Sequence, residues 1–214
     1  MDMKYVSTRS AGGDGVCSAA AIKQGLCSDG GLFMPTELPE LVDGDLVELC
    51  GMSYPQRAAN ILSRFLTDYT YDELLADCSE SYSESRFPGG ATPIKAVGDQ
   101  LRVLELWHGP TCAFKDMALQ IMPRLLTRAL KKTDEKRTAL ILTATSGDTG
   151  KAALEGYRDV DGVKIMVFYP VNGVSCVQKL QMTTQGGENV AVCAVDGNFD
   201  DAQSGVKRIF SDLS

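Results

Sequence analysis

The feature that most limits the fold of this chain is a regular alternation of apolar runs and helical patterns in its second half. The runs are apolar throughout rather than on alternate residues, which is typical of strands buried on both faces of a parallel sheet. Expected strands cover residues 102–107, 138–145, 163–169 and 190–195, and expected helices cover residues 114–130, 149–158, 174–183 and 200–210. Since parallel strands are joined by right-handed helical crossovers, the pattern predicts an α/β fold: an open parallel sheet with helices on both faces.

The first part of the chain has a different pattern. Apolar residues recur there at helical intervals, and Thr70 with Glu73 forms the capping-box signature of a helix start. Residues 79–90 are rich in Ser, Glu, Pro and Gly, a composition typical of a boundary. We therefore expect a mostly helical N-terminal domain over residues 1–85, followed by the sheet domain over residues 86–214.

Composition and charge exclude several classes of function. The formal charge of −7 supplies no basic surplus to neutralise phosphates, so nucleic acid is not an expected partner. No apolar run is long enough to cross a bilayer, so we expect no membrane partner. The 7 cysteines are scattered without C-x-x-C spacing and His108 is the one histidine, which argues against a metal site or a disulfide framework. Free thiols, with an N-terminus that lacks the features of a secretory signal, favour the cytoplasm.

Lys115 is the first candidate for chemistry. It follows the expected strand 102–107 and a break at Gly109-Pro110, and it stands in the first turn of the expected helix 114–130. The positive end of the helix dipole, together with partial burial, favours a lowered pKa and the neutral, nucleophilic amine that Schiff-base chemistry needs. An isolated lysine at a helix start is more often simply solvated, so the neighbouring residues must decide between the two interpretations.

The loop after the next expected strand is the second candidate. Its sequence, Thr145-Ser146-Gly147-Asp148-Thr149, ends an apolar strand and opens a helix. Glycine lets a ligand approach the backbone, the helix start offers unpaired N–H groups, and hydroxyl groups stand beside them. Such a loop suits a carboxylate or a phosphate, although on its own it is equally well explained as an ordinary helix cap.

The two candidates gain weight together. In an open parallel sheet, ligands gather at the carboxyl ends of the strands, so Lys115 and residues 145–149 are expected at the same rim. A lysine able to form a Schiff base beside a site for an anion is what a pyridoxal phosphate enzyme acting on amino acids requires. The lysine carries the cofactor, and the loop holds the substrate carboxylate.

Several segments resemble one enzyme family. Residues 108–116 are similar to the cofactor-lysine motif of threonine synthases, and residues 144–150 are similar to the substrate loop of that family. Further similarity covers residues 4–9, 29–32, 173–175, 178–183 and 197–203. Ser10 differs from the family, which usually has glycine there, and this affects a local turn rather than the chemistry. With several motifs in the same order, the chain is identified as a member of the threonine synthase family of type II pyridoxal phosphate enzymes.

The resemblance implies a reaction and roles for individual residues. The reaction is the conversion of O-phospho-L-homoserine and water to L-threonine and phosphate, in threonine biosynthesis. Lys115 is expected to form the aldimine with pyridoxal phosphate and then to move protons along the substrate carbons. The expected substrate-binding residues are Thr145, Ser146, Gly147, Asp148 and Thr149, and Asp148 is also expected to lie near the cofactor.

Two residues of the lysine motif have alternative interpretations. His108 either contacts the substrate or is a packed, hydrogen-bonded residue at a strand end, and the second is favoured. Asp116 either pairs with Lys115 or simply favours the helix start, and again the second is favoured.

The resemblance also implies that part of the family's chain is absent. The family continues for a comparable length beyond Ser214, and that part carries the glycine-rich loop for the cofactor phosphate and the residue that meets the pyridine nitrogen. We therefore expect this chain to bind the cofactor weakly, to be inactive alone, and to expose a truncated sheet able to self-associate. Two alternatives stay open: a threonine-synthase-like phospho-lyase acting on another phosphorylated amino alcohol, and a non-catalytic binding domain that keeps the fold.

Overall fold

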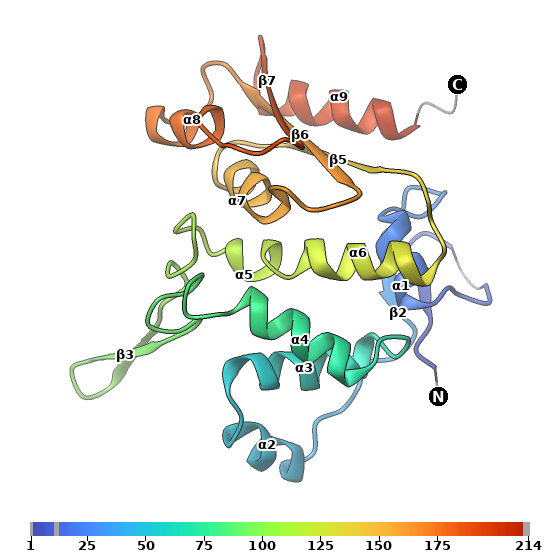
Figure 1. The fold of residues 1–214 in the computed structure, drawn as a ribbon, viewed down its shortest axis with the longest axis vertical. Helices are drawn as coiled ribbons and strands as arrows, with labels where there is room; N and C mark the ends of the chain where they lie inside the picture. Colours follow the sequence, from blue (N-terminus) through green and yellow to red (C-terminus); the bar gives the residue numbers. More distant parts are fainter. Residues whose placement is uncertain (1, 11–12, 212–214) are drawn as a thin grey trace. The chain divides into compact units, whose positions relative to one another are not determined.

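The structure, a computed structural model, describes residues 2–10 and 13–211. The chain divides into two compact units (Figure 1). Unit 1 comprises Met1–Ser83 with Arg124–Lys136, and unit 2 comprises Glu84–Pro123 with Arg137–Ser214. This division follows packing, and the division of the sequence into domains 1–85 and 86–214 stays a prediction.

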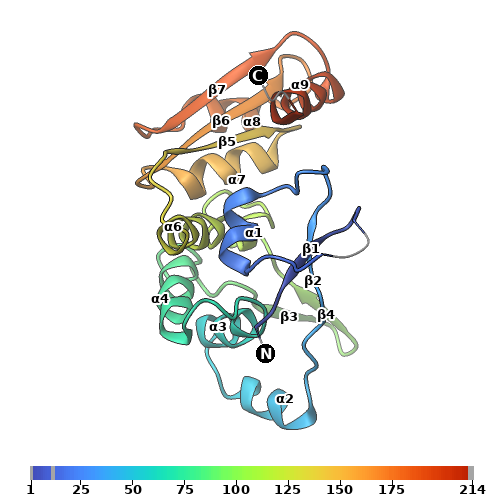
Figure 2. The same ribbon diagram turned by 90° about the vertical axis from the view of Figure 1, so that its right-hand side faces the viewer.

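Unit 1 begins with a small antiparallel sheet. Strand β1 (Tyr5–Ser7) pairs with β2 (Phe33–Pro35), and the two strands lie side by side in Figure 2. Between them in sequence lies helix α1 (Ser18–Gln24), which ends at Gly25. Gly25 has φ 75° and ψ −69°, a tight-turn conformation that glycine adopts more readily than other residues, and the Leu26 N–H donates across it to the Gln24 carbonyl at 3.0 Å.

The remaining elements of unit 1 are helical. They are α2 (Asp43–Cys50), α3 (Tyr54–Phe65), α4 (Tyr71–Ser81) and most of α6 (Met122–Lys132). The predicted capping box at the start of α4 is confirmed: the Glu73 N–H donates to the Thr70 hydroxyl at 3.2 Å, and the Thr70 N–H donates to the Glu73 carboxylate at 2.9 Å. Both bonds satisfy N–H groups that a helix start leaves without an intrahelical acceptor.

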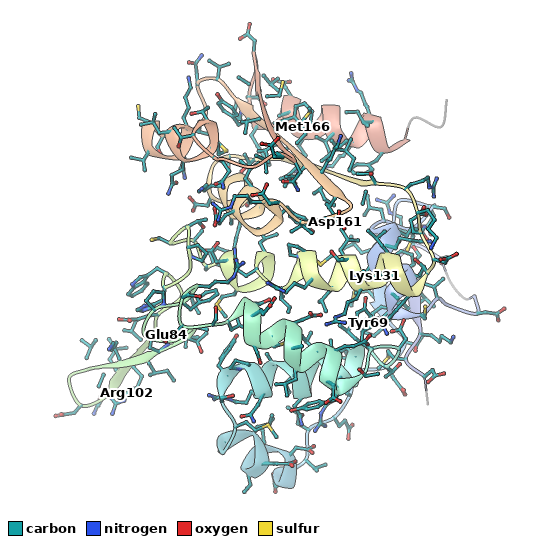
Figure 3. All side chains as sticks on the ribbon, in the orientation of Figure 1. Tyr69, Glu84, Arg102, Lys131, Asp161 and Met166 are labelled. Atoms are coloured by element: carbon teal, nitrogen blue, oxygen red, sulfur yellow. The ribbon has the colours of Figure 1, made fainter. Side chains whose placement is uncertain are left out.

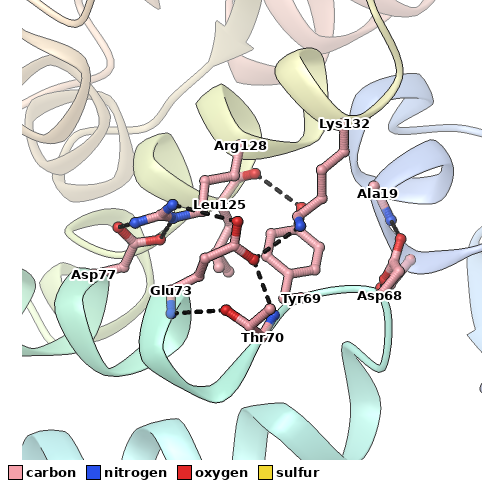
Figure 4. A network of polar contacts seen from close by, with 10 residues as sticks. Ala19, Asp68, Tyr69, Thr70, Glu73, Asp77, Leu125, Arg128 and Lys132 are labelled. Atoms are coloured by element: carbon pink, nitrogen blue, oxygen red, sulfur yellow. Dashed lines mark hydrogen bonds and ion pairs between the residues drawn. The ribbon is translucent and has the colours of Figure 1, made fainter.

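Polar contacts join α6 to α4 and to Tyr69, which stands two residues before α4 (Figure 4). The Tyr69 hydroxyl donates to the carbonyl of Leu125 at 3.0 Å, and burial raises the pKa of Tyr69. Arg128 donates to both carboxylate oxygens of Asp77, with Nη2 at 2.9 Å, and Lys132 lies 2.8 Å from Glu73. Such two-point guanidinium–carboxylate pairing fixes orientation as well as distance, which explains why residues 124–136 belong to unit 1.

Unit 2 is built on a parallel sheet. Strands β5 (Ala139–Ala144), β6 (Val163–Pro170) and β7 (Val190–Val195) lie in the order β5-β6-β7, and each pair is parallel. The central strand is the most deeply buried: Ile165 and Val167 are almost completely shielded. Asp161 lies in the turn before β6, at the amino end of the strand, and Met166 lies in the middle of β6 (Figure 3). The helices that follow the strands begin at the other edge of the sheet, where the strands have their carboxyl ends.

Helices cover both faces of this sheet. Helix α7 (Asp148–Tyr157) packs on β6 and on α8 (Cys176–Thr183), whereas α9 (Phe199–Ser211) packs on β5 and β6. In Figure 2, α8 lies behind the sheet and α9 in front of it. The predicted α/β class, with an open parallel sheet and helices on both faces, is therefore confirmed. The placement of α7 and α8 agrees with right-handed crossovers between successive parallel strands.

The prediction that residues 102–107 form a strand of the parallel sheet is wrong. Instead β4 (Leu101–Leu104) pairs antiparallel with β3 (Ile94–Val97) in a separate hairpin, on which Arg102 is labelled in Figure 3. The turn that makes this hairpin contains Gly98, at φ 64°, a position that glycine fills without strain. A short apolar run does not distinguish a sheet strand from a hairpin strand, and the turn before it was the signal to use.

The predicted helix 114–130 is interrupted. It consists of α5 (Asp116–Leu119) and α6, with Gln120 and Ile121 between them. Pro123 stands at the second position of α6, in the first turn, where a helix needs no N–H bond from it. The interruption therefore lies before Pro123, at Gln120 and Ile121.

Candidate active site

Lys115 directly precedes α5, and its side chain is half-buried. The ammonium nitrogen lies 4.2 Å from the centroid of the Phe114 ring, a cation–π contact, and Phe114 itself is exposed. Among the residues that the structure describes, the Lys115 amine makes no hydrogen bond and no ion pair. An amine in this position is free to bind a ligand.

Asp116, the next residue, is completely buried. Its carboxylate accepts a hydrogen bond from the Thr111 N–H at 2.8 Å and a second from the Thr111 hydroxyl at 2.8 Å. Burial raises the pKa of Asp116, and the two bonds from Thr111 work against that increase. Neither sequence interpretation of Asp116 describes this contact, because the carboxylate closes the turn that precedes Lys115.

The loop at residues 145–149 is ordered from within. The Thr145 side chain is buried, and its hydroxyl accepts hydrogen bonds from the N–H groups of Gly147 and Gly150, each at 2.9 Å. Gly147 has φ 146°, a conformation that side chains rarely adopt, and a Cβ atom there would lie 2.4 Å from the Gln178 side chain. Thr145 therefore organises the loop, and its predicted contact with a substrate stays a prediction.

Gln178, from α8, orients Asp148. Its Nε2 donates to Asp148 Oδ1 at 2.8 Å, while its Oε1 accepts from the Ser175 N–H at 3.1 Å in the capping box of α8. In the sequence, the one signal for Gln178 is the family similarity of residues 178–183. Gln178 ties the start of α8 to the first residue of α7.

The ligand-accessible part of the loop is the start of α7. Ser146 and Asp148 are exposed, and Thr149 is half-buried. The N–H groups of Asp148 and Thr149 stand in the first turn, where a helix provides no acceptor for them. These donors and hydroxyls suit an anion.

The two candidate segments lie on packed elements of unit 2. Helix α5 packs against α7. Lys151 and Glu155 of α7 affect the Asp116 carboxylate electrostatically. The backbones approach closely at Gly156, where an added Cβ would lie 2.0 Å from the Leu119 carbonyl oxygen. Lys115 therefore precedes one helix of a packed pair and the loop precedes the other, and their meeting at one rim stays a prediction. The predicted route, through a strand of the sheet ending before Lys115, is wrong, since β4 belongs to the hairpin.

His108 is held by its neighbours. Its Nε2 lies 2.7 Å from Glu105 Oε2, its Nδ1 lies 3.3 Å from the Pro88 carbonyl, and its ring stacks on Trp107. This is the packed, hydrogen-bonded arrangement favoured from the sequence. Within residues 2–10 and 13–211, no group of three or more His, Cys, Asp or Glu side chains forms a metal site, and no helix is long and apolar enough to span a membrane.

Comparison with known proteins points to one family. A family model described as "Threonine synthase N terminus" matches residues 4–82. The threonine synthase of Schizosaccharomyces pombe is 41% identical over 219 residues, a stretch covering 99% of this chain. A crystal structure of pyridoxal-phosphate-bound threonine synthase from Brucella melitensis aligns over 99% of this chain, with a TM-score of 0.87 and 38% identity.

The chain belongs to the threonine synthase family. It corresponds to the N-terminal part of these proteins and spans less than half of their length: 42% of the S. pombe protein and 45% of the B. melitensis chain. The human protein "Threonine synthase-like 2" is also similar, with 36% identity over 214 residues that cover 99% of this chain and 43% of that protein. The threonine synthase structures also confirm the predicted type II pyridoxal phosphate enzyme fold.

Proposed function

We propose that this chain supplies the cofactor lysine and the substrate loop of a threonine synthase, which converts O-phospho-L-homoserine and water to L-threonine and phosphate. The observation that carries the proposal is the Lys115 amine, half-buried and without a hydrogen bond or ion pair among the described residues. It precedes α5, which packs on α7, the helix that begins with the anion-binding loop. Identity of 41% to the S. pombe threonine synthase over 219 aligned residues supports the assignment.

The residues present fit pyridoxal phosphate. Lys115 Nζ is free to bond to the aldehyde carbon, and the start of α7 offers N–H and hydroxyl donors to an anionic group. When bound, the cofactor withdraws electrons from the substrate carbons and so makes their protons easier to remove. The B. melitensis relative has been solved with pyridoxal phosphate bound, which supports the same cofactor here.

Each of the site residues has a proposed role. Lys115 holds the cofactor, and its amine then takes up and returns protons along the substrate. The Ser146 and Thr149 hydroxyls, with the backbone of Gly147, bind the substrate carboxylate. Asp148, held by Gln178 at 2.8 Å, would lie near the bound cofactor. Thr145 maintains the loop through its bonds to two amides.

The domain organisation and location belong to the same proposal. Residues 1–85 form the N-terminal domain of the enzyme, and residues 86–214 form the first part of the cofactor-binding domain. The match of the family model to residues 4–82 supports the first of these. The scattered cysteines, all of them free thiols, support a reducing cytoplasm as the place of action.

We further propose that the 214-residue chain binds the cofactor weakly and is inactive alone. It spans 42% of the S. pombe enzyme, so more than half of that enzyme has no counterpart here. On α9, Ile209 and Phe210 are 52% and 54% exposed, which supports self-association of the isolated chain through its sheet unit.

A second candidate function is a phospho-lyase acting on another phosphorylated amino alcohol. The similarity to human threonine synthase-like 2, at 36% identity, favours keeping it. The two candidates share Lys115 and the loop and differ in the substrate side chain. Substrate preference therefore separates them.

The test uses this chain joined to the C-terminal part of the S. pombe relative, called the joined protein below. With pyridoxal phosphate, we expect threonine and phosphate from O-phospho-L-homoserine, no product from the 214-residue chain alone, and no product after Lys115→Ala. A clear preference for O-phosphoethanolamine-type substrates would support the second candidate. No product from any substrate, while the intact S. pombe enzyme is active in the same assay, would count against both.

A further inference from the structure

We propose that Asp116 is a positioning residue for Lys115: its buried carboxylate closes residues 109–116 into a fixed turn and so sets the direction of the lysine amine. The proposal rests on the proposed function of Lys115. Asp116 touches no ligand in this account and acts through the backbone of the residue before it.

The carboxylate is matched to two donors on one residue. The N–H of Thr111 donates to Oδ2 at 2.8 Å, and the Thr111 hydroxyl donates to Oδ1 at 2.8 Å. Thr111 and Asp116 are both buried, at 7% and 0% exposure, so water does not compete for these bonds. The two oxygens thus join Thr111, near the beginning of the turn, to Asp116 at its end, five positions later in the sequence.

The turn is packed tightly around this carboxylate. A Cβ on Gly109 would lie 2.5 Å from both Cβ and Oδ2 of Asp116, so only glycine fits there. Cys112, inside the turn, has φ 59°, and its N–H donates to the Gly109 carbonyl at 3.1 Å. Side chains other than glycine rarely adopt such a φ unless the surrounding structure holds them in it.

The same residue connects the turn to the substrate loop. Asp116 begins α5, and α5 packs on α7 through the contact of Leu119 with Gly156. Lys151 and Glu155 of α7 both act on the Asp116 carboxylate electrostatically. A change at Asp116 therefore affects the turn at residues 109–116 where it leads into α5, the helix that packs on α7.

The chemistry of the pair selects the test variants. In Asp116→Asn, one carboxylate oxygen becomes an NH₂ group, so the side chain keeps one acceptor oxygen for the two donors of Thr111. Thr111→Val removes the hydroxyl and keeps the N–H, while Thr111→Ser keeps both donors. Asp99→Asn is the matched control, because Asp99 is an exposed residue of the hairpin in the same unit.

The experiment has two measurements on the 214-residue chain. Amide hydrogen exchange of peptides covering residues 109–116 reports the turn without any cofactor. Incubation with pyridoxal phosphate, borohydride reduction and peptide mapping gives the ratio of pyridoxyl adduct at Lys115 to adduct at Lys95, an exposed lysine of the hairpin. Circular dichroism checks that each variant folds.

We expect Asp116→Asn to speed exchange in the turn and to lower the Lys115/Lys95 ratio by about tenfold or more, since small misplacements of a reacting group have effects of this size. Thr111→Val should shift both measurements in the same direction by less, and Thr111→Ser and Asp99→Asn should leave both near the unaltered values. If Asp116→Asn does not fold, the Thr111→Val and Thr111→Ser pair decides.

Two results would overturn the proposal. If Asp116→Asn speeds exchange but leaves the Lys115/Lys95 ratio unchanged, the Asp116–Thr111 hydrogen bonds hold the turn but do not position the lysine. If exchange is unchanged, these hydrogen bonds do not hold the turn. Failure of the proposed function gives a different result: the unaltered chain then shows no preference for Lys115 over Lys95, whatever the exchange measurement shows, and the positioning role is rejected with it.

Discussion

Charged side chains are used differently in the two units. In unit 1, Arg128 and Lys132 of α6 are each paired with carboxylates of α4, namely Asp77 and Glu73 (Figure 4). In the described part of unit 2, the Lys115 amine has no such partner and lies over an aromatic ring. A paired cation holds two helices together, whereas an unpaired, half-buried amine is available to bind a ligand.

Two carboxylates show the same contrast. The pKa of Glu73 is held below its usual value, chiefly by its hydrogen bond with Lys132. The pKa of Asp116 is raised by burial, and the hydrogen bonds from the uncharged groups of Thr111 offset that increase only in part. In unit 1 these ion pairs join two helices, whereas in unit 2 the carboxylate beside Lys115 is held by neutral donors.

Lys115→Ala should have the largest effect of any single change. In the joined protein we expect kcat/KM to fall about 10³-fold or more, because the group that holds the cofactor and moves protons is lost. Stability should change by less than about 0.5 kcal/mol, since the amine makes no ion pair in the described structure. Lys95→Ala, in the hairpin, is the control and should leave the rate unchanged. Comparable rates for the two variants would contradict the contrast between the units.

Asp77→Ala should show the opposite pattern. It removes the carboxylate that accepts hydrogen bonds from Arg128, and we expect the free energy of unfolding to fall by about 2 kcal/mol. This is less than the roughly 3–5 kcal/mol expected for a fully buried pair, because the Arg128 side chain is 29% exposed. Hydrogen exchange of peptides from α4 and α6 measures the loss locally. Asp72→Ala, on the exposed side of α4, serves as control. Faster exchange confined to β5–β7 would contradict the assignment of the Arg128–Asp77 pair to the stability of unit 1.

Thr145→Val separates loop structure from ligand binding. The hydroxyl binds the amides of Gly147 and Gly150, so its removal leaves two donors without their acceptor. We expect a loss of about 1–2 kcal/mol in urea unfolding, within the range of lost helix caps and buried hydrogen bonds. A Thr145→Ser variant should retain most of the stability. No change in Thr145→Val would mean that the loop is held by other contacts.

Ser146→Ala should spare stability and weaken binding. Its side chain is exposed at the start of α7, and we assign its hydroxyl to the substrate carboxylate. In the joined protein KM should rise by about tenfold to a hundredfold, the value of one hydrogen bond to a charged group, with kcat little changed. Ser204→Ala, exposed on α9, is the matched control. An unchanged KM would remove Ser146 from the site.

The smallest predicted effect concerns acid stability of unit 1. Because the folded-state pKa of Glu73 is lowered, its ionised form stabilises the fold above the unfolded pKa, and this contribution is lost as pH falls through the folded value. Lys132→Met should therefore flatten the stability profile between about pH 5 and pH 3, by a few tenths of a kcal/mol as expected for a partly exposed pair. Lys131→Met, one residue earlier and exposed, should leave the profile unchanged. A steeper profile after Lys132→Met would contradict the assigned sign.

Much of the fold was predictable from local chemistry. The strands β5, β6 and β7 were found because buried parallel strands are apolar on every residue, and the start of α4 because Thr70 and Glu73 satisfy each other's N–H groups. The hairpin strand β4 was assigned to the sheet, since an apolar run does not carry the identity of its partner strand.

The sequence predicted the motifs of the candidate site but not the side-chain contacts that hold them in place. Lys115 and residues 145–149 stand out by residue type and position. The contacts of Asp116 with Thr111 and of Gln178 with Asp148 depend on side-chain directions that spacing alone does not reveal. The membership of residues 124–136 in unit 1 likewise depends on pairs more than 50 residues apart, such as Arg128 with Asp77, |i−j| 51.

The most direct test of Lys115 as the cofactor lysine is peptide mapping of the 214-residue chain after incubation with pyridoxal phosphate and borohydride reduction. If Lys115 holds the cofactor, its peptide carries the pyridoxyl adduct at lower cofactor concentration than the peptides of Lys95 or Lys132, and free O-phospho-L-homoserine reduces that adduct. Equal modification of all three lysines, unaffected by the phosphorylated substrate, would contradict the assignment.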